Sequence, residues 1–171
     1  MKQGYIQIYT GNGKGKTTAA LGISLRAVCA GKRVFFGQFI KGMKYSELKA
    51  PEYLPNFVIK QFGRGCFIEN KAEEADIIAA RAGLEVFNEV LKSGEYDLVV
   101  LDEVNVAIHF GLIETGEVLK VLKNRSPGVE VVLTGRYAPE ELVEIADLVT
   151  EMREIKHYYK NGVKARTGIE K

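Results

Sequence analysis

Residues 10–18 bring glycine, lysine and threonine together as Thr-Gly-Asn-Gly-Lys-Gly-Lys-Thr-Thr, between an alternating apolar stretch and an apolar run. Glycines let successive backbone N–H groups converge on phosphate oxygens, and a helix that starts here adds about half a positive charge. Lys16 supplies a full charge, and the hydroxyl of Thr17 is suited to bind Mg²⁺. The pattern therefore predicts a phosphate-binding loop (P-loop) for the polyphosphate of ATP, rather than a glycine-rich turn with incidental lysines. The residues expected at the nucleotide are Gly11, Asn12, Gly13, Lys14, Gly15, Lys16, Thr17 and Thr18.

One position departs from the usual P-loop pattern. That pattern opens on a glycine, whereas this chain has Thr10 there. We expect Gly11 and Gly13 to supply the missing flexibility, and the loop to hold its nucleotide in an unusual way.

Two acidic residues follow a run that is typical of a buried strand. Residues 99–103 read Val-Val-Leu-Asp-Glu and end in Asp102 and Glu103. The carboxyl end of a strand is where an open α/β sheet places its ligand groups. We expect one of these carboxylates to reach the metal, directly or through water, with Glu103 the better candidate and Asp102 the other. We expect Lys16, Thr17 and Glu103 to be the catalytic residues. The alternative is that the acidic residues serve solubility or cap a helix.

No general base stands out in the sequence. His109 follows the acidic pair and His157 follows Lys156, but an isolated histidine is more often packed or at the surface than catalytic. A second substrate that is itself a strong nucleophile would need no base. Binding, orientation and stabilisation of the leaving polyphosphate would then suffice.

Apolar periodicity predicts the elements that position these residues. The expected strands are residues 5–9, 33–40, 57–61, 97–102, 129–134 and 147–152. The expected helices include residues 17–30, 72–91, 117–122 and 139–145. We expect a solvent- and ligand-facing connection at residues 41–55 and a turn at residues 63–65, and residues 156–171 are hard to assign. In the second helix, the stripe expected to pack on the sheet is Ala75, Ala79, Ala82, Val86 and Val90.

Strands that alternate with helices indicate an α/β fold. We expect a single domain over residues 1–171, P-loop NTPase-like and RecA-like, with a mostly parallel sheet and helices on both faces. No apolar run reaches the roughly 18 residues of a membrane span, and no signal-peptide pattern is seen, so a cytoplasmic location is expected. A net charge of +2 does not demand nucleic acid as a partner. Cys29 and Cys66 form neither a disulfide framework nor a zinc spacing.

Six segments carry a resemblance along nearly the whole chain. They are TGNGKGKTTAALG (10–22), QFIKG (38–42), VVLDE (99–103), LTGR (133–136), ADLVTEM (146–152) and KHYYKNGVKARTGIE (156–170). Only the first is specific by itself. Because the six segments occur in this order and spacing, the chain resembles the P-loop type of ATP:corrinoid adenosyltransferases, which act on cob(I)alamin, cobinamide or cob(I)yrinic acid a,c-diamide.

The resemblance implies that Co(I) of a reduced corrinoid attacks C5′ of ATP and expels triphosphate. The cobalt is then the nucleophile, which would explain the absence of a base. The family is thought to bind ATP in a reversed direction, with Mg²⁺ (or Mn²⁺) at the triphosphate. The partners implied are ATP, the corrinoid, an electron donor such as a flavodoxin or flavin reductase, and a second copy of the chain in a homodimer.

The resemblance also suggests residues around the nucleotide and corrinoid. Gln38 and Lys41 are candidates at the end of the second strand, and Arg136 at the end of another, although each also fits a strand end or a surface turn. Relatives carry aromatics in the loop after the third strand, where this chain has Phe67 and Ile68 and no Trp. These two side chains are expected to face the corrinoid or to pack in the core.

Two further points follow from the comparison with the family. Relatives with a longer N-terminus use a leading helix to cover the site, so here we expect the cover to come from elsewhere or to be absent. The basic residues of the last segment, Lys156, Lys160, Lys164 and Arg166, are expected to be mostly solvated or structural. The alternatives to adenosyl transfer are a P-loop ATPase or small-molecule kinase, and a nucleotide-binding regulator or corrinoid carrier without turnover.

Overall fold

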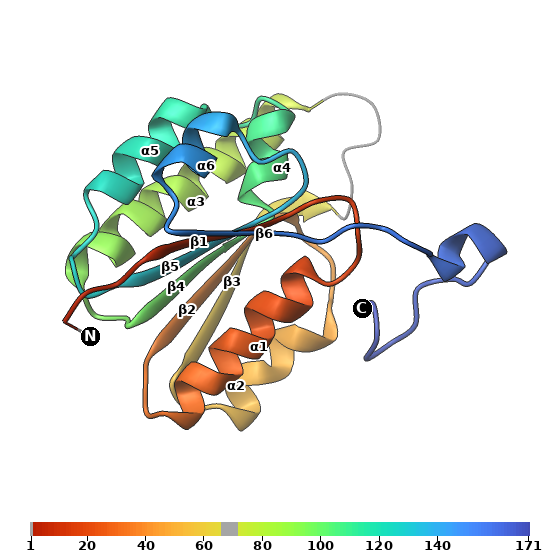
Figure 1. Ribbon diagram of the computed structural model, residues 1–171, viewed down its shortest axis with the longest axis horizontal. Coiled ribbons are helices and arrows are strands. Elements are labelled where there is room, and N and C mark those ends of the chain that lie inside the picture. The colour runs from red at the N-terminus through yellow and green to blue at the C-terminus, as the bar shows by residue number, and fades with distance from the viewer. Residues whose placement is uncertain (1, 66–71) are drawn as a thin grey trace.

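A parallel sheet forms the centre of the computed structural model, which describes residues 2–65 and 72–171 (Figure 1). Its strands are β1 (Ile6–Thr10), β2 (Val34–Lys41), β3 (Phe57–Gly65), β4 (Leu98–Asp102), β5 (Glu130–Thr134) and β6 (Leu148–Glu151). They lie in the order β3-β2-β4-β5-β1-β6, and every neighbouring pair is parallel. The expected α/β, P-loop NTPase-like fold is therefore confirmed.

Helices cover both faces of this sheet (Figure 1). One face carries α3 (Glu74–Ser93), α4 (Val104–His109), α5 (Thr115–Lys123) and α6 (Glu140–Ile145). The other carries α1 (Lys16–Cys29) and α2 (Ala50–Tyr53), and short 3₁₀ turns lie at Ser46–Lys49 and Tyr158–Asn161. In the part of the chain that the structure describes, no helix has the length and apolarity to cross a membrane.

The central strand shows why the sequence of the sheet reads as continuous apolar runs. All five residues of β4 are buried. Val99 and Leu101 join the core under α3, whereas Leu98 and Val100 join the core under α1. Since successive side chains point to opposite faces, a strand covered on both sides must be apolar at every position.

Parallel pairing also gathers the candidate residues. The carboxyl ends of β1, β2, β4 and β5 meet at one edge of the sheet. The P-loop (residues 10–18) follows β1, Lys41 ends β2 and Asp102 ends β4. Sequence segments that are far apart therefore converge where ligands bind in open α/β sheets.

The predicted turn at residues 63–65 is wrong, because these residues continue β3. Lys41 pairs with Gly65 across the end of the sheet after a register shift in β2. Gly63 fits because it has no side chain: a Cβ there would lie 2.2 Å from the carbonyl carbon of Ile40. Gly63 thus permits close approach of the two strands rather than a turn.

The predicted packing stripe of α3 is only partly right, because Val86 and Val90 pack against the core but Ala82 is exposed and no member of the stripe is fully buried. The helix buries Ala80, Leu84, Phe87 and Leu91 instead. Phe87 stacks on Phe39, with 5.4 Å between ring centroids, so the large side chains face the sheet. They remove more apolar area from water than the alanine stripe would, and this decides the rotation of the helix. The short helices α2 and α4 were not among the predicted elements.

Candidate active site

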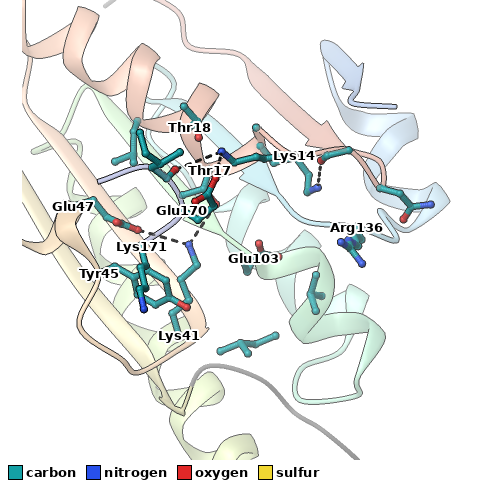
Figure 2. A pocket seen from close by; sticks show the side chains of 18 of the residues that line it. Lys14, Thr17, Thr18, Lys41, Tyr45, Glu47, Glu103, Arg136, Glu170 and Lys171 are labelled. Carbon is teal, nitrogen blue, oxygen red and sulfur yellow. Dashed lines mark hydrogen bonds and ion pairs between the residues drawn. The ribbon is translucent and has the colours of Figure 1, made fainter. Parts of the chain in front are cut away.

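A cavity of about 720 Å³ opens at the carboxyl edge of the sheet (Figure 2). The P-loop forms one wall, and the end of β2 with the connection after it forms another. Residues from both ends and the middle of α4, the segment after β5, His157 and residues 168–171 also line it. A volume of this size is typical of small-molecule and cofactor sites.

Two glycines give the P-loop its shape. Gly11 has φ +93° and Gly15 has φ +120°, conformations that side chains rarely adopt. Gly13 donates its N–H to the carbonyl of Met152 at 2.6 Å, and a Cβ on Gly13 would lie 2.7 Å from the same oxygen. Thr10 is the last residue of β1. Gly11 thus provides the turn after Thr10, as expected, whereas Gly13 permits a close approach to Met152 and does not adopt a positive φ.

Lys16 lies beneath this loop with only 8% of its surface exposed. Its ammonium donates to the carbonyl oxygens of Gly11 at 2.7 Å and Gly13 at 2.9 Å. Burial lowers the pKa of Lys16, and the nearby carboxylate of Glu103 partly offsets this effect. The loop therefore already holds a desolvated positive charge in the wall of the cavity.

Asp102 is fully buried and joins the walls of the cavity. One carboxylate oxygen accepts hydrogen bonds from the hydroxyls of Thr17 at 2.9 Å and Thr134 at 2.7 Å. The other accepts from Lys41 at 2.9 Å and Gln38 at 3.2 Å. These four partners satisfy the buried carboxylate and fix the position of the Thr17 hydroxyl.

Glu103 turns into the cavity because its backbone is left-handed, with φ +60°. Its N–H donates to Thr134 Oγ1 at 2.9 Å. It occupies the N-cap position of α4, but its side chain makes no capping hydrogen bond. Burial, and after it the charge of Asp102, raises the pKa of Glu103 above its ordinary value. A strained residue with a perturbed carboxyl in a cavity is typical of a functional site.

The remaining predicted residues differ in whether they line the cavity. Arg136 lines the cavity with an exposed side chain. Gln38 is fully buried behind Asp102 and does not contribute to the lining. Phe67 and Ile68 lie outside the described residues. His109 is exposed at the end of α4, where it stacks on Tyr137 with 3.9 Å between centroids.

Comparison with known proteins decides the family. A family model described as ATP:corrinoid adenosyltransferase BtuR/CobO/CobP matches residues 2–170. The chain belongs to the ATP:corrinoid adenosyltransferase family. It is 37% identical over 173 residues to a corrinoid adenosyltransferase of a Sinorhizobium species, with 99% of this chain and 81% of that protein covered. The corrinoid adenosyltransferases of Pseudomonas aeruginosa and Escherichia coli K12 are 37% and 34% identical, with 99% of this chain and 84% and 86% of those proteins covered.

The last segment of this family member forms part of the site, which its composition did not indicate. Glu170 accepts from Lys14 of the P-loop at 3.0 Å and from Arg166 at 3.1 Å, and it also bonds the hydroxyl of Tyr158. We call Lys14, Tyr158, Arg166 and Glu170 the Glu170 cluster. Arg166 and then Tyr158, followed by Lys14, hold the pKa of Glu170 well below its usual range. The predicted structural role of Arg166 fits this arrangement.

Glu170→Gln is expected to loosen this segment from the P-loop. The glutamine side chain cannot form ion pairs with Lys14 and Arg166. Hydrogen exchange of the backbone amides should therefore rise several-fold over residues 166–171, and KM for ATP should rise as well. Since the folded pKa is lowered, the carboxylate contributes above the ordinary value of 4.5 and its contribution is lost only as pH falls through the lowered pKa. Exchange in the unaltered chain should therefore be equally slow, after correction for intrinsic rates, at pH 7 and pH 5.

The matched control is Glu154→Gln. Glu154 pairs with Lys160 in the same part of the chain, rather than with a lysine of the P-loop. It should leave exchange at residues 166–171 unchanged. Equal exchange in Glu170→Gln and the unaltered chain would show that the Glu170 cluster does not hold the segment.

Proposed function

We propose that this chain transfers the 5′-deoxyadenosyl group of ATP to Co(I) of a corrinoid and releases triphosphate. The observation that carries the proposal is the family match over residues 2–170. The geometry agrees with it, because the P-loop and the acidic end of β4 line one cavity. The cavity has a size suited to a nucleotide.

In the proposed step, the electron pair of Co(I) attacks C5′ of ATP. A cobalt–carbon bond forms, the C5′–oxygen bond breaks, and the bonding electrons leave with triphosphate. Lys16 and the N-terminal amides of α1 stabilise the negative charge that develops on the leaving group. Arg136, which also lines the cavity, is placed to orient the nucleotide or the corrinoid.

Oxygen ligands for Mg²⁺ or Mn²⁺ are available in this site. The Thr17 hydroxyl and the carboxylates of Asp102 and Glu103 are hard donors of the kind these cations prefer. Within residues 2–65 and 72–171, no group of three or more His, Cys, Asp and Glu side chains gathers to hold a metal alone. Phosphate oxygens of the substrate would complete the ligand set, and the cation would neutralise charge on the triphosphate.

An anaerobic assay tests the proposal. Chemically reduced cobalamin, ATP and Mg²⁺ are incubated with the protein, the Co(I) absorbance is followed, and the phosphate products are separated. We expect loss of Co(I) absorbance with equimolar adenosylcobalamin and triphosphate. Release of ADP at a rate independent of cobalamin would contradict the proposal.

A second candidate function, ATP hydrolysis, is favoured by one observation. Glu103 carries a raised pKa and stands next to the buried Asp102 in the nucleotide cavity, an arrangement that could orient water. Hydrolysis yields ADP and inorganic phosphate, so the same product analysis separates the two reactions. A homodimer, a flavodoxin or flavin reductase as electron donor, a cytoplasmic location and a single domain over the whole chain stay predictions.

A further inference from the structure

The ammonium of Lys41 contacts two of the three protein groups proposed to hold a metal ion, Thr17 and Asp102. It donates to Asp102 Oδ2 at 2.9 Å and to Thr17 Oγ1 at 3.4 Å. Figure 2 shows Lys41 pointing toward Thr17 and Glu47. Only 14% of the Lys41 side chain is exposed, and that of Asp102 is fully buried. A positive charge is thus already present at the proposed cation position.

The hydrogen bonds around Thr17 show that this position suits a cation. Thr17 donates its only hydroxyl proton to Asp102 Oδ1, so the lone pairs of its oxygen remain for an acceptor role toward Lys41. Besides the bond from Lys41, the carboxylate of Asp102 accepts hydrogen bonds from Thr17, Thr134 and Gln38. A divalent cation and the ammonium would therefore use the same oxygen atoms.

The end of β2 directs Lys41 into this position. The register of β2 shifts between Phe39 and Lys41, and Ile40 between them has φ +65°. A β-branched residue with positive φ is strained, which indicates that the surrounding structure enforces the bend. The bend turns the last side chain of the strand toward the P-loop.

Lys41 also has a second carboxylate within reach. Glu47, in the 3₁₀ turn after β2, lies 3.8 Å from the ammonium and is itself held by Gln38 at 3.0 Å. The ammonium can therefore exchange Asp102 for Glu47 and keep a carboxylate as its partner.

We infer that Lys41 is a resident cation that occupies the divalent-metal position in the nucleotide-free protein and must move toward Glu47 when a metal–ATP complex binds. The inference rests on the proposed use of metal–ATP at this site. Two cations cannot share the same two oxygens, because their repulsion is weakly screened in a buried environment. Lys41 thus keeps free metal out until the triphosphate supplies further ligands.

The test is Mn²⁺ binding to the nucleotide-free protein, measured by electron paramagnetic resonance of the free ion. Lys41→Met keeps most of the length of the side chain but removes its charge. We expect this variant to bind Mn²⁺ at least 10-fold tighter than the unaltered chain. Lys14→Met is the matched control, because Lys14 lines the same cavity but is held by Glu170. It should not change Mn²⁺ binding. Adding Asp102→Asn to Lys41→Met should remove the gain.

Folding is checked by circular dichroism and thermal unfolding, with Lys41→Gln as the second variant if Lys41→Met is unfolded. If a folded Lys41 variant bound Mn²⁺ no more tightly than the unaltered chain, the inference would be overturned. An equal gain in Lys14→Met would overturn it too, because general loss of positive charge would then be the cause. The titration contains neither ATP nor corrinoid, so its outcome is independent of whether the proposed transfer reaction occurs.

Discussion

Lys16→Met is expected to lower kcat for adenosyl transfer by about 10²- to 10³-fold, the loss seen when one preorganised donor to a developing negative charge is removed. Lys16 is the buried cation of the P-loop, and its ammonium is already desolvated against the carbonyl oxygens of Gly11 and Gly13. Methionine fills nearly the same space but cannot donate a hydrogen bond. Single-turnover loss of Co(I) absorbance at saturating ATP measures the effect.

Lys14→Met is the matched control for this prediction. It removes a lysine from the same loop, but one with an exposed side chain that is paired with Glu170. We expect a change in KM for ATP with kcat within a few-fold of the unaltered chain, since an interaction made equally in ground and transition states affects binding only. If both variants lost kcat equally, Lys16 would have no special role at the leaving group.

The strands of the sheet could be predicted because the apolar pattern that marks each one lies within a short stretch of sequence. Each strand predicted from an apolar run is present, with ends shifted by a few residues, and β4 is apolar throughout because helices cover both of its faces. The P-loop could be predicted for the same reason. Its glycines, Lys16 and Thr17 lie within one short segment whose backbone geometry depends on those residue types.

The parts that failed depend on contacts between distant segments. Residues 63–65 are rich in glycine, which favours a turn, but pairing with the end of β2 makes them a strand. The buried face of α3 is decided by the aromatic side chains of β2 that it meets. In both cases tertiary contacts override the local preference.

The candidate site shows the same division. Thr17 and Asp102 were expected near the metal, and their direct hydrogen bond joins them. By contrast, Glu170 meets Lys14 across 156 positions of sequence, and no periodic pattern marks an isolated acid in a polar segment. The left-handed backbone of Glu103 could not be predicted either, because glutamate has no preference for it.

Glu103→Gln is expected to lower kcat by on the order of 10²-fold and, at neutral pH, to raise the melting temperature. The loss of activity follows from removing a carboxylate that lines the nucleotide cavity and is a candidate metal ligand. The gain in stability follows from burial and Asp102, which raise the pKa of Glu103 and thus make its ionised form unfavourable in the folded state. Glutamine keeps the size of the side chain and the left-handed backbone, so the comparison isolates the charge.

The sign of the pH dependence distinguishes this cause from a change in packing. A carboxyl with a raised folded pKa stabilises the fold below its unfolded value, ordinarily 4.5, and this contribution is lost as pH rises through the folded pKa. The difference in melting temperature between Glu103→Gln and the unaltered chain should therefore be small at pH 4.5 and grow toward neutral pH. Glu144→Gln, an exposed change on α6, should show no such growth. If the difference in melting temperature between Glu103→Gln and the unaltered chain were the same at every pH, the charge of Glu103 would not oppose folding. Binding of a cation next to Glu103 would then relieve no unfavourable charge in the folded protein.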